Sequence, residues 1–177
     1  MRKTLLQGLR PPLTESAPGA ADPELAALAA TVNQAAERTL GRSLAIRHVD
    51  AGSCNGCELE IHALGNAFYD LERFGFRFVA SPRHADVLLV TGPVTKNMRE
   101  ALERTYAATP SPKWVVAAGD CAIGCGVFAG SYAVAGSYAC VGGVANVVPV
   151  DLHIPGCPPT PTALLKGLLA LMTKTSG

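Results

Sequence analysis

The pattern that most constrains the fold is the alternation of short apolar runs with amphipathic segments along residues 44–173. Two of the apolar runs, 86–91 and 114–118, are nearly continuous, as in strands that are covered on both faces. Segments with helical spacing separate these runs. Parallel neighbours in a sheet need a crossover, and the crossover is right-handed. The sequence therefore predicts an α/β fold, a flavodoxin-like three-layer sandwich with a mostly parallel sheet.

The expected elements follow one another in a regular order. Strands are predicted at 44–49, 76–80, 86–91, 114–118 and 147–152, and helices at 23–41, 59–74, 98–107 and 162–173. Residues 119–146 are dense in Gly, Ala and Ser, which predicts a long functional loop. Residues 1–22 contain three prolines and lack periodicity. We therefore expect an extended N-terminal arm at 1–22, followed by a single domain at 23–177.

Composition excludes some classes of partner. Lys and Arg number 15 against 14 Asp and Glu, so no charge excess favours nucleic acid or an anionic membrane as the main partner. The longest apolar run, near 164–172, is too short to span a bilayer. Residues 1–12 lack an apolar core of secretory length, which favours a cytoplasmic location. The six cysteines are then more often metal ligands or catalytic thiols than disulfides.

Four of the six cysteines directly follow predicted strands. In an open parallel sheet such positions lie at one edge, and ligands bind in the crevice outside the carboxyl ends of the strands. Loops that are distant in sequence can therefore converge there. The four residues are Cys54 and Cys57 after the first strand, Cys121 after 114–118, and Cys157 after 147–152.

Four thiolates suit an iron–sulfur cubane, because each iron binds one cysteine. Gly56 allows close approach of the backbone between the first two cysteines, and the following helix turns its N-terminal amides toward a negatively charged group. The run 155–159 is a rigid Pro-Gly-Cys-Pro-Pro turn. A Cys-x-x-Cys pair alone is also found in zinc sites and thioredoxin-like motifs. A zinc site would predict a second close pair, and a thioredoxin-like site would leave the 155–159 turn without a role.

Several ordered motifs over residues 44–170 make the chain resemble one family. It resembles the small subunit of membrane-bound nickel-iron hydrogenases related to complex I, of the formate hydrogenlyase type, and the homologous 20 kDa subunit of NADH:quinone oxidoreductase. The motifs are Ser53-Cys54-Asn55-Gly56-Cys57-Glu58, Ser81-Pro82-Arg83-His84-Ala85-Asp86 with Thr91-Gly92, Gly119-Asp120-Cys121-Ala122, and Pro155-Gly156-Cys157-Pro158-Pro159.

The resemblance implies one proximal 4Fe-4S cluster held by Cys54, Cys57, Cys121 and Cys157, in an electron-transfer subunit that is not catalytic alone. It implies a large subunit with the nickel-iron centre, a ferredoxin-like subunit and membrane-arm subunits as partners. The location would be peripheral, on the cytoplasmic face of the inner membrane. The two residues between Cys54 and Cys57 favour the hydrogenase branch, since the complex I subunit usually has adjacent cysteines there. The alternatives are a quinone-reducing complex whose large subunit lacks nickel, and a zinc-binding scaffold without redox function.

Other residues have simpler interpretations beside the functional ones. Cys125 and Cys140 are expected to be small buried hydrophobes, although Cys125 could replace Cys121 as a ligand. Glu58 is expected to complement the dipole of its helix, with a proton route as the alternative. Arg83 and His84 could touch the large subunit or the cluster surroundings, or lie in a solvated loop. His62 and His153 are expected to be structural, and the segment 124–143, with Phe128, Tyr132 and Tyr138, is expected to pack against a partner.

Overall fold

The computed structural model of the chain describes residues 42–132 and 139–175, together with Pro23, Ala27, Ala30, Thr31 and Gln34. The expected N-terminal arm at 1–22 and most of the expected helix at 23–41 lie outside the described residues, and the five described positions of that helix are helical. None of the helices among the described residues has the length and apolar character needed to cross a membrane.

Five parallel strands form the main sheet, in the order β2-β1-β3-β5-β7. Counted among themselves, these strands have the order 2-1-3-4-5, which is that of flavodoxin-like folds. The expected fold class is therefore confirmed. The strands are β1 (Leu44–Asp50), β2 (Phe76–Phe78), β3 (Val87–Thr91), β5 (Trp114–Ala118) and β7 (Leu152–Ile154).

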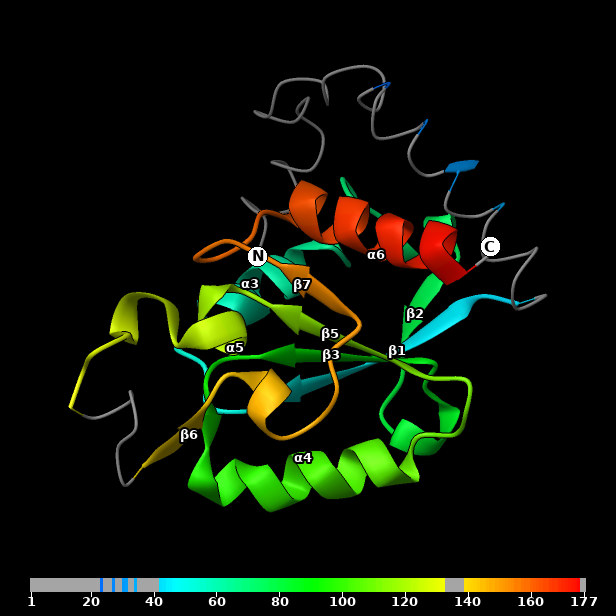
Figure 1. The fold of residues 1–177 in the computed structure, drawn as a ribbon. Helices are drawn as coiled ribbons and strands as arrows, with labels where there is room; N and C mark the ends of the chain where they lie inside the picture. The colour runs from blue at the N-terminus through cyan, green and yellow to red at the C-terminus, as the bar shows by residue number, and fades with distance from the viewer. Residues whose placement is uncertain are drawn as a thin grey trace, which may run out of the picture.

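Helices cover both faces of this sheet (Figure 1). The helix α4 (Lys96–Ala108) lies on one face, and α3 (Gly56–Ala63) and α6 (Pro161–Thr175) lie on the other. Alternate residues of β3 enter the two cores, with Leu89 on the α3 and α6 side and Leu88 on the α4 side. Burial on both faces explains why the run is almost continuously apolar.

The expected helix at 59–74 is wrong in its extent. The helix α3 ends at Ala63, and a separate 3-10 turn follows at Leu71–Phe74. The Asn66 Oδ1 accepts hydrogen bonds from the amides of Phe68 and Tyr69, both at 2.9 Å. A side chain that binds nearby amides in this way competes with the helical ladder, which accounts for the break.

The expected last strand is displaced along the sequence. The β-branched residues of 147–152 predict a strand there, whereas the strand that joins the sheet, β7, comprises Leu152–Ile154. Pro149 cannot donate to a strand ladder, and Val148 instead packs into the core on the α4 side. The chain enters the sheet only after Asp151, whose amide donates to the Val115 carbonyl at 2.9 Å.

The described residues of the segment 119–146 form several short elements, where the sequence predicts a long loop. It contains a short helix α5 (Asp120–Gly124), 3-10 turns at Gly126–Phe128 and Val144–Asn146, and the strand β6 (Cys140–Gly142). The strand β6 pairs antiparallel with β4 (Val94–Thr95), which the sequence does not predict. Residues 133–138, including Tyr138, lie outside the described residues.

Candidate metal centre

The carboxyl edge of the sheet carries a cavity of about 150 Å³. All four cysteines that follow strands line it, although they come from three loops. The lining residues are Ser53, Cys54, Gly56, Cys57, Asp120, Cys121, Gly156, Cys157 and Pro158. The structure thus brings together the residues that the sequence analysis selected.

The first loop is shaped by side chains just after β1. The Asp50 Oδ1 accepts hydrogen bonds from the amides of Gly52 and Ser53, both at 2.8 Å. The Ser53 Oγ accepts from the Asn55 amide at 3.0 Å, and Asn55 has a left-handed backbone with φ 72°. These short-range bonds turn the chain sharply, so that α3 starts at Gly56 and Cys57 lies in its first turn.

Gly119 makes room for one of the thiols. Its φ is +93°, and a Cβ at this position would lie 2.7 Å from the Cys57 Sγ and 3.6 Å from the Gly156 carbonyl oxygen. A larger residue would therefore have to displace the thiol as well as adopt a strained backbone. The absence of a side chain at Gly119 therefore lets the loop after β5 lie next to the thiol of the first loop.

Asp120 joins the loop of Cys121 to the loop of Cys157. Its amide donates to the Gly156 carbonyl at 2.9 Å, and its Oδ1 accepts from the Gly156 amide at 2.8 Å. This reciprocal pair ties the carboxyl end of β5 to that of β7. Asp120 belongs to one of the sequence motifs, but its role could not be predicted, because the bond joins residues that are 36 positions apart.

The cavity disfavours free thiolates. Burial raises the pKa of Cys57 to about 12, and the charges of Glu58, Cys121, Cys54 and Cys157 act in the same direction. The pKa of Cys121 is also raised, first by burial and then by Cys157, Cys54 and Asp120. A positively charged group beside Cys57 and Cys121 would favour their thiolate forms. A metal group supplies that charge and deprotonates coordinating thiols.

The cysteines surround a space and do not meet at one point. Within the ranges 42–132 and 139–175, no three His, Cys, Asp or Glu side chains are grouped so that they could hold a single metal ion. The set of donors is therefore four thiols spread around the cavity of about 150 Å³.

Glu58 is the centre of a buried polar network beside this cavity. Its carboxylate accepts hydrogen bonds from the hydroxyls of Ser53 and Thr91. The His48 Nε2 lies 3.0 Å from the Thr91 Oγ1 and 3.5 Å from the Glu58 Oε1. Burial lowers the pKa of His48, while the charges of Glu58 and Asp50 partly oppose this shift. Glu58 does stand in the first turn of α3, as the dipole interpretation requires, but it also links the cysteine loop to β3.

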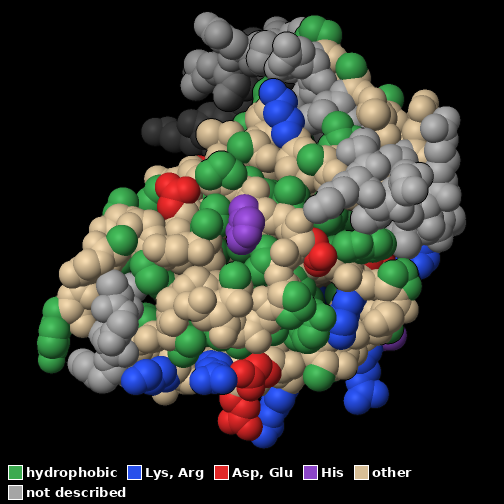
Figure 2. All heavy atoms as spheres, viewed as in Figure 1, with side chains coloured by type: hydrophobic (Ala, Val, Ile, Leu, Met, Phe, Trp, Pro, Cys, Tyr) green, Lys and Arg blue, Asp and Glu red, His purple; other side chains and the backbone are tan. Residues whose placement is uncertain are grey.

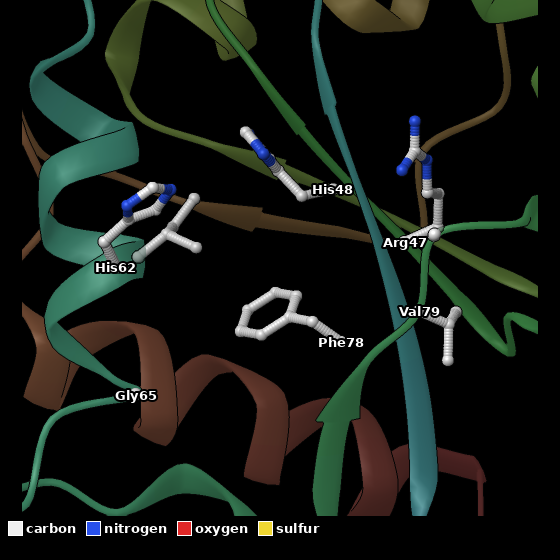
Figure 3. Close-up of a pocket in the computed structure, with 8 residues that line it drawn as sticks. Arg47, His48, His62, Gly65, Phe78 and Val79 are labelled. Atoms are coloured by element: carbon white, nitrogen blue, oxygen red, sulfur yellow. The ribbon is translucent and has the colours of Figure 1, made fainter.

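A second cavity, of about 400 Å³, adjoins this network on the side of β2 (Figure 3). His48 and Phe78 project from β1 and β2 toward α3, where His62 faces the same space, while Arg47 and Val79 lie on the other side of β1. His62 therefore lines a cavity. His153, by contrast, is exposed on β7.

Cys125 and Cys140 lie outside the cysteine-lined cavity. Both are buried, with 8% and 7% of their surface exposed, as expected of small hydrophobes. Cys125 follows α5 in a left-handed conformation, and Cys140 opens β6. Cys121 lines the cavity, whereas Cys125 and Cys140 do not. The geometry therefore does not favour Cys125 as a ligand in place of Cys121.

Comparison with known proteins gives matches over this whole region. Residues 54–171 match the family model described as NADH ubiquinone oxidoreductase, 20 Kd subunit. The chain is 46% identical over 135 residues to the probable membrane-bound hydrogenase subunit mbhJ of Pyrococcus furiosus, with 76% of this chain and 77% of that protein covered. It is 45% identical over 130 residues to formate hydrogenlyase subunit 7 of Escherichia coli, with 73% of this chain and 49% of that protein covered.

Among solved structures, the chain is similar to a subunit of the membrane-bound sulfane sulfur reductase, an archaeal respiratory membrane complex. The TM-score is 0.65 at 35% sequence identity, and the match covers 81% of this chain and 74% of the other. The chain spans about half the length of formate hydrogenlyase subunit 7 and about three quarters of the other two proteins.

Proposed function

This chain belongs to the family of the 20 kDa subunit of NADH ubiquinone oxidoreductase, and on that premise we propose that it is the electron-transfer subunit of a membrane-bound hydrogenase complex, holding one 4Fe-4S cluster. Its relatives are subunits of hydrogenase complexes, and it is likewise a subunit of an oxidoreductase that does not act alone. The observation that carries the proposal is the convergence of Cys54, Cys57, Cys121 and Cys157 on one cavity.

The residues present suit a cluster better than a single ion. A structural zinc needs four donors at about 2.0–2.3 Å from one point, and the described residues contain no such group. Four thiols around a cavity correspond to one ligand for each of four irons. When bound, such a cluster would accept and release one electron reversibly.

The remaining residues of the site act by holding the ligands. Asp120 ties the Cys121 loop to the Cys157 loop, and Glu58 ties the Cys54 and Cys57 loop to β3 through Thr91. Gly119 leaves the Cys57 thiol free to face the cavity. Ligands that are held in place from all three loops move little when the charge of the bound group changes, which favours electron transfer.

We place the partner surface beside α5. Val127 and Tyr132 are 72% and 86% exposed, and Phe128 is 37% exposed, which is unusual for three large apolar side chains within six residues. This agrees with the expectation that the segment 124–143 packs against a partner. The large subunit would cover it, with ferredoxin-like and membrane-arm subunits completing a complex that is peripheral to the cytoplasmic face of the membrane.

The test is metal analysis of the intact complex purified without oxygen. We expect the complex to contain four more irons and four more acid-labile sulfides per chain than the same complex with Cys121→Ala, and to show one further electron paramagnetic resonance signal on reduction. Cys121→Ala should abolish the signal, whereas Cys140→Ala, which removes a buried thiol outside the cavity, should retain it. One zinc per chain, together with equal iron in the unchanged complex and in the Cys121→Ala complex, would contradict the proposal.

A second candidate concerns the partner's chemistry. Because the similar structure is a sulfane sulfur reductase, the large subunit could use electrons for a substrate other than hydrogen. The complex I alternative, a quinone-reducing complex without nickel, belongs to the same class. Nickel analysis and hydrogen evolution by the intact complex distinguish a hydrogenase from these alternatives. A nickel-free complex with an intact cluster would refute the hydrogenase assignment and leave the cluster assignment in place.

A further inference from the structure

A pocket of about 300 Å³ lies at the amino edge of the sheet, opposite to the cysteines. Its lining is cationic, although the whole chain is nearly neutral. The lining residues are Arg42, Arg77, Arg83, His84 and Pro110. Arg83 and His84 precede β3, so the expectation that they touch the cluster surroundings is wrong. Figure 2, drawn from the same side as Figure 1, shows basic side chains at the right-hand end, where the amino ends of the strands lie.

The positive charge of this pocket is only partly neutralised. Arg42 forms a bidentate pair with Asp86, at 2.6 and 3.0 Å. In the described part of the chain, no carboxylate forms an ion pair with Arg77 or Arg83. Of the three guanidinium groups, that of Arg42 has a carboxylate partner, which leaves the two positive charges of Arg77 and Arg83 without counting His84. Guanidinium groups that share a pocket repel one another unless an anion lies between them.

The basic side chains of this pocket come from three separate segments of the chain. Asp86 is buried and also accepts from the Ala45 amide at 2.9 Å, so the guanidinium of Arg42 is anchored. Arg77 projects from β2. Arg83 and His84 lie in a 3-10 turn (Pro82–His84) whose first residue is proline and whose cap, Ser81, accepts from the Arg83 amide. Because Arg77 lies in a strand and Arg83 in a capped turn, little backbone entropy would be lost when an anion is bound.

Arginine suits one class of anion in particular. The planar guanidinium donates two parallel hydrogen bonds to a phosphate or carboxylate, and arginines approaching from different directions match a tetrahedral oxyanion with several acceptors. We propose that the pocket formed by Arg42, Arg77, Arg83 and His84 binds a phosphoryl group. Two sources share this chemistry: inorganic phosphate, and the phosphate of an anionic lipid headgroup. The second source would bring the amino edge of the sheet to a membrane surface.

The test measures binding of inorganic phosphate to the purified complex by isothermal titration calorimetry at low ionic strength. Arg77→Gln combined with Arg83→Gln should weaken binding by about tenfold or more, because two charge-assisted contacts are lost. The matched control is Arg99→Gln with Arg104→Gln. It removes the same charge from α4, where Arg99 and Arg104 pair with Glu103 and Glu100 on the surface, and should leave the binding unchanged.

A second arm distinguishes the two sources. Flotation with vesicles of phosphatidylcholine plus phosphatidylglycerol, compared with phosphatidylcholine alone, reports on a headgroup. Flotation that depends on phosphatidylglycerol and on the two arginines assigns a lipid, whereas phosphate binding without flotation assigns the free anion. Both signals should weaken as salt is added, because the guanidinium charges are exposed.

Three outcomes would overturn the proposal. The first is the absence of both phosphate binding and flotation, and the second is equal behaviour of the double variant and its α4 control. The third is that the double variant binds phosphate normally but loses a partner subunit during purification. The pocket would then be a contact with an acidic protein surface. Iron content, measured in parallel, should be the same in all variants, because the pocket lies at the edge opposite to the cysteines.

Discussion

The two edges of one parallel sheet hold their polar groups in different ways. At the carboxyl edge, glycines and short acidic side chains bring three loops around a cavity of about 150 Å³. At the amino edge, long arginine side chains from three segments surround a pocket of about 300 Å³ and remain exposed. The carboxyl edge thus depends on backbone geometry, whereas the amino edge depends on charge. Small steric changes should therefore damage the first, and changes of charge the second.

The largest effect is expected from Gly119→Ala at the carboxyl edge. The added Cβ would lie 2.7 Å from the Cys57 Sγ, at a φ of +93°. Strain and overpacking together should cost about 2–5 kcal/mol of unfolding free energy, and most of the iron should be lost. Iron content per chain and urea denaturation measure both effects.

The matched control for this change is Gly130→Ala. Gly130 has a similar φ of +81°, but nothing lies within 4 Å of the added Cβ. It should cost about 1–2 kcal/mol through the backbone alone and retain its iron. Equal loss of iron in the two variants would mean that the approach of Gly119 to Cys57 has no special importance.

The next largest effect is expected from Asp86→Ala at the amino edge. The change leaves the Ala45 amide without its buried acceptor and Arg42 without its partner. We expect a loss of about 2–3 kcal/mol, mostly from the amide, because Arg42 is half exposed and screened by solvent. Iron per folded chain should not change, and a drop in iron at constant folded fraction would show that the two edges are coupled.

A smaller effect is expected from Asp120→Ala at the carboxyl edge. One hydrogen bond to the Gly156 amide is lost, while the bond from the Asp120 amide remains. The cost should be about 1–2 kcal/mol, and cluster retention in air should fall because the Cys157 loop is less well held. Asp151→Ala, which removes a similar bond to the Val115 amide away from the cavity, serves as the control. If both variants keep the cluster equally well, Asp120 has no role in holding the ligand loops.

The smallest effect concerns pH and His48. Burial lowers the pKa of His48 below 6.5 in the folded chain, so the unfolded chain binds this proton more readily. The free energy of unfolding should therefore fall as the pH drops through 6.5 toward the folded-state pKa, with no contribution above that window. In His48→Gln the free energy of unfolding should fall less on acidification, by a difference of less than about 1 kcal/mol.

Urea denaturation at neutral and mildly acidic pH, followed by Trp114 fluorescence, measures the loss. His153→Gln, at an exposed site on β7, is the control. If His48→Gln leaves the pH dependence of stability unchanged, another group is responsible for it.

The sequence predicted the parts of this molecule that depend on local patterns. The sequence predicted the strands at 44–50, 87–91 and 114–118 and the C-terminal helix. Burial on both faces leaves a continuous apolar run in a strand, and burial of one face leaves a helical period. The predicted extent of the helix at 59–74 was wrong. The helix ends at residue 63 because the Asn66 side chain binds nearby amides, which competes with the hydrogen bonds of a longer helix. The last strand was predicted too early in the sequence, because the β-branched residues at 147–150 pack into the core and do not join the sheet.

The candidate site shows the same division. The four cysteines could be selected from sequence, because each follows a strand and the carboxyl ends of parallel strands share an edge. The link between Glu58 and Thr91 joins residues that are 33 positions apart, and no local signal reports it. The same holds for the arginine pocket, whose members look like unrelated surface charges along the chain.

By itself, the amino-acid sequence determined the class of fold, the order of the main-sheet strands along the chain, and which thiols can line one cavity. Those properties follow from hydrophobic periodicity and from the geometry of parallel sheets, which act over a few residues or through a general rule. Only the tertiary structure decided how closely Gly119 approaches Cys57, which acids tie the ligand loops, and which arginines share a pocket. These depend on packing between segments that are distant in the chain, where differences of one atom decide the contact.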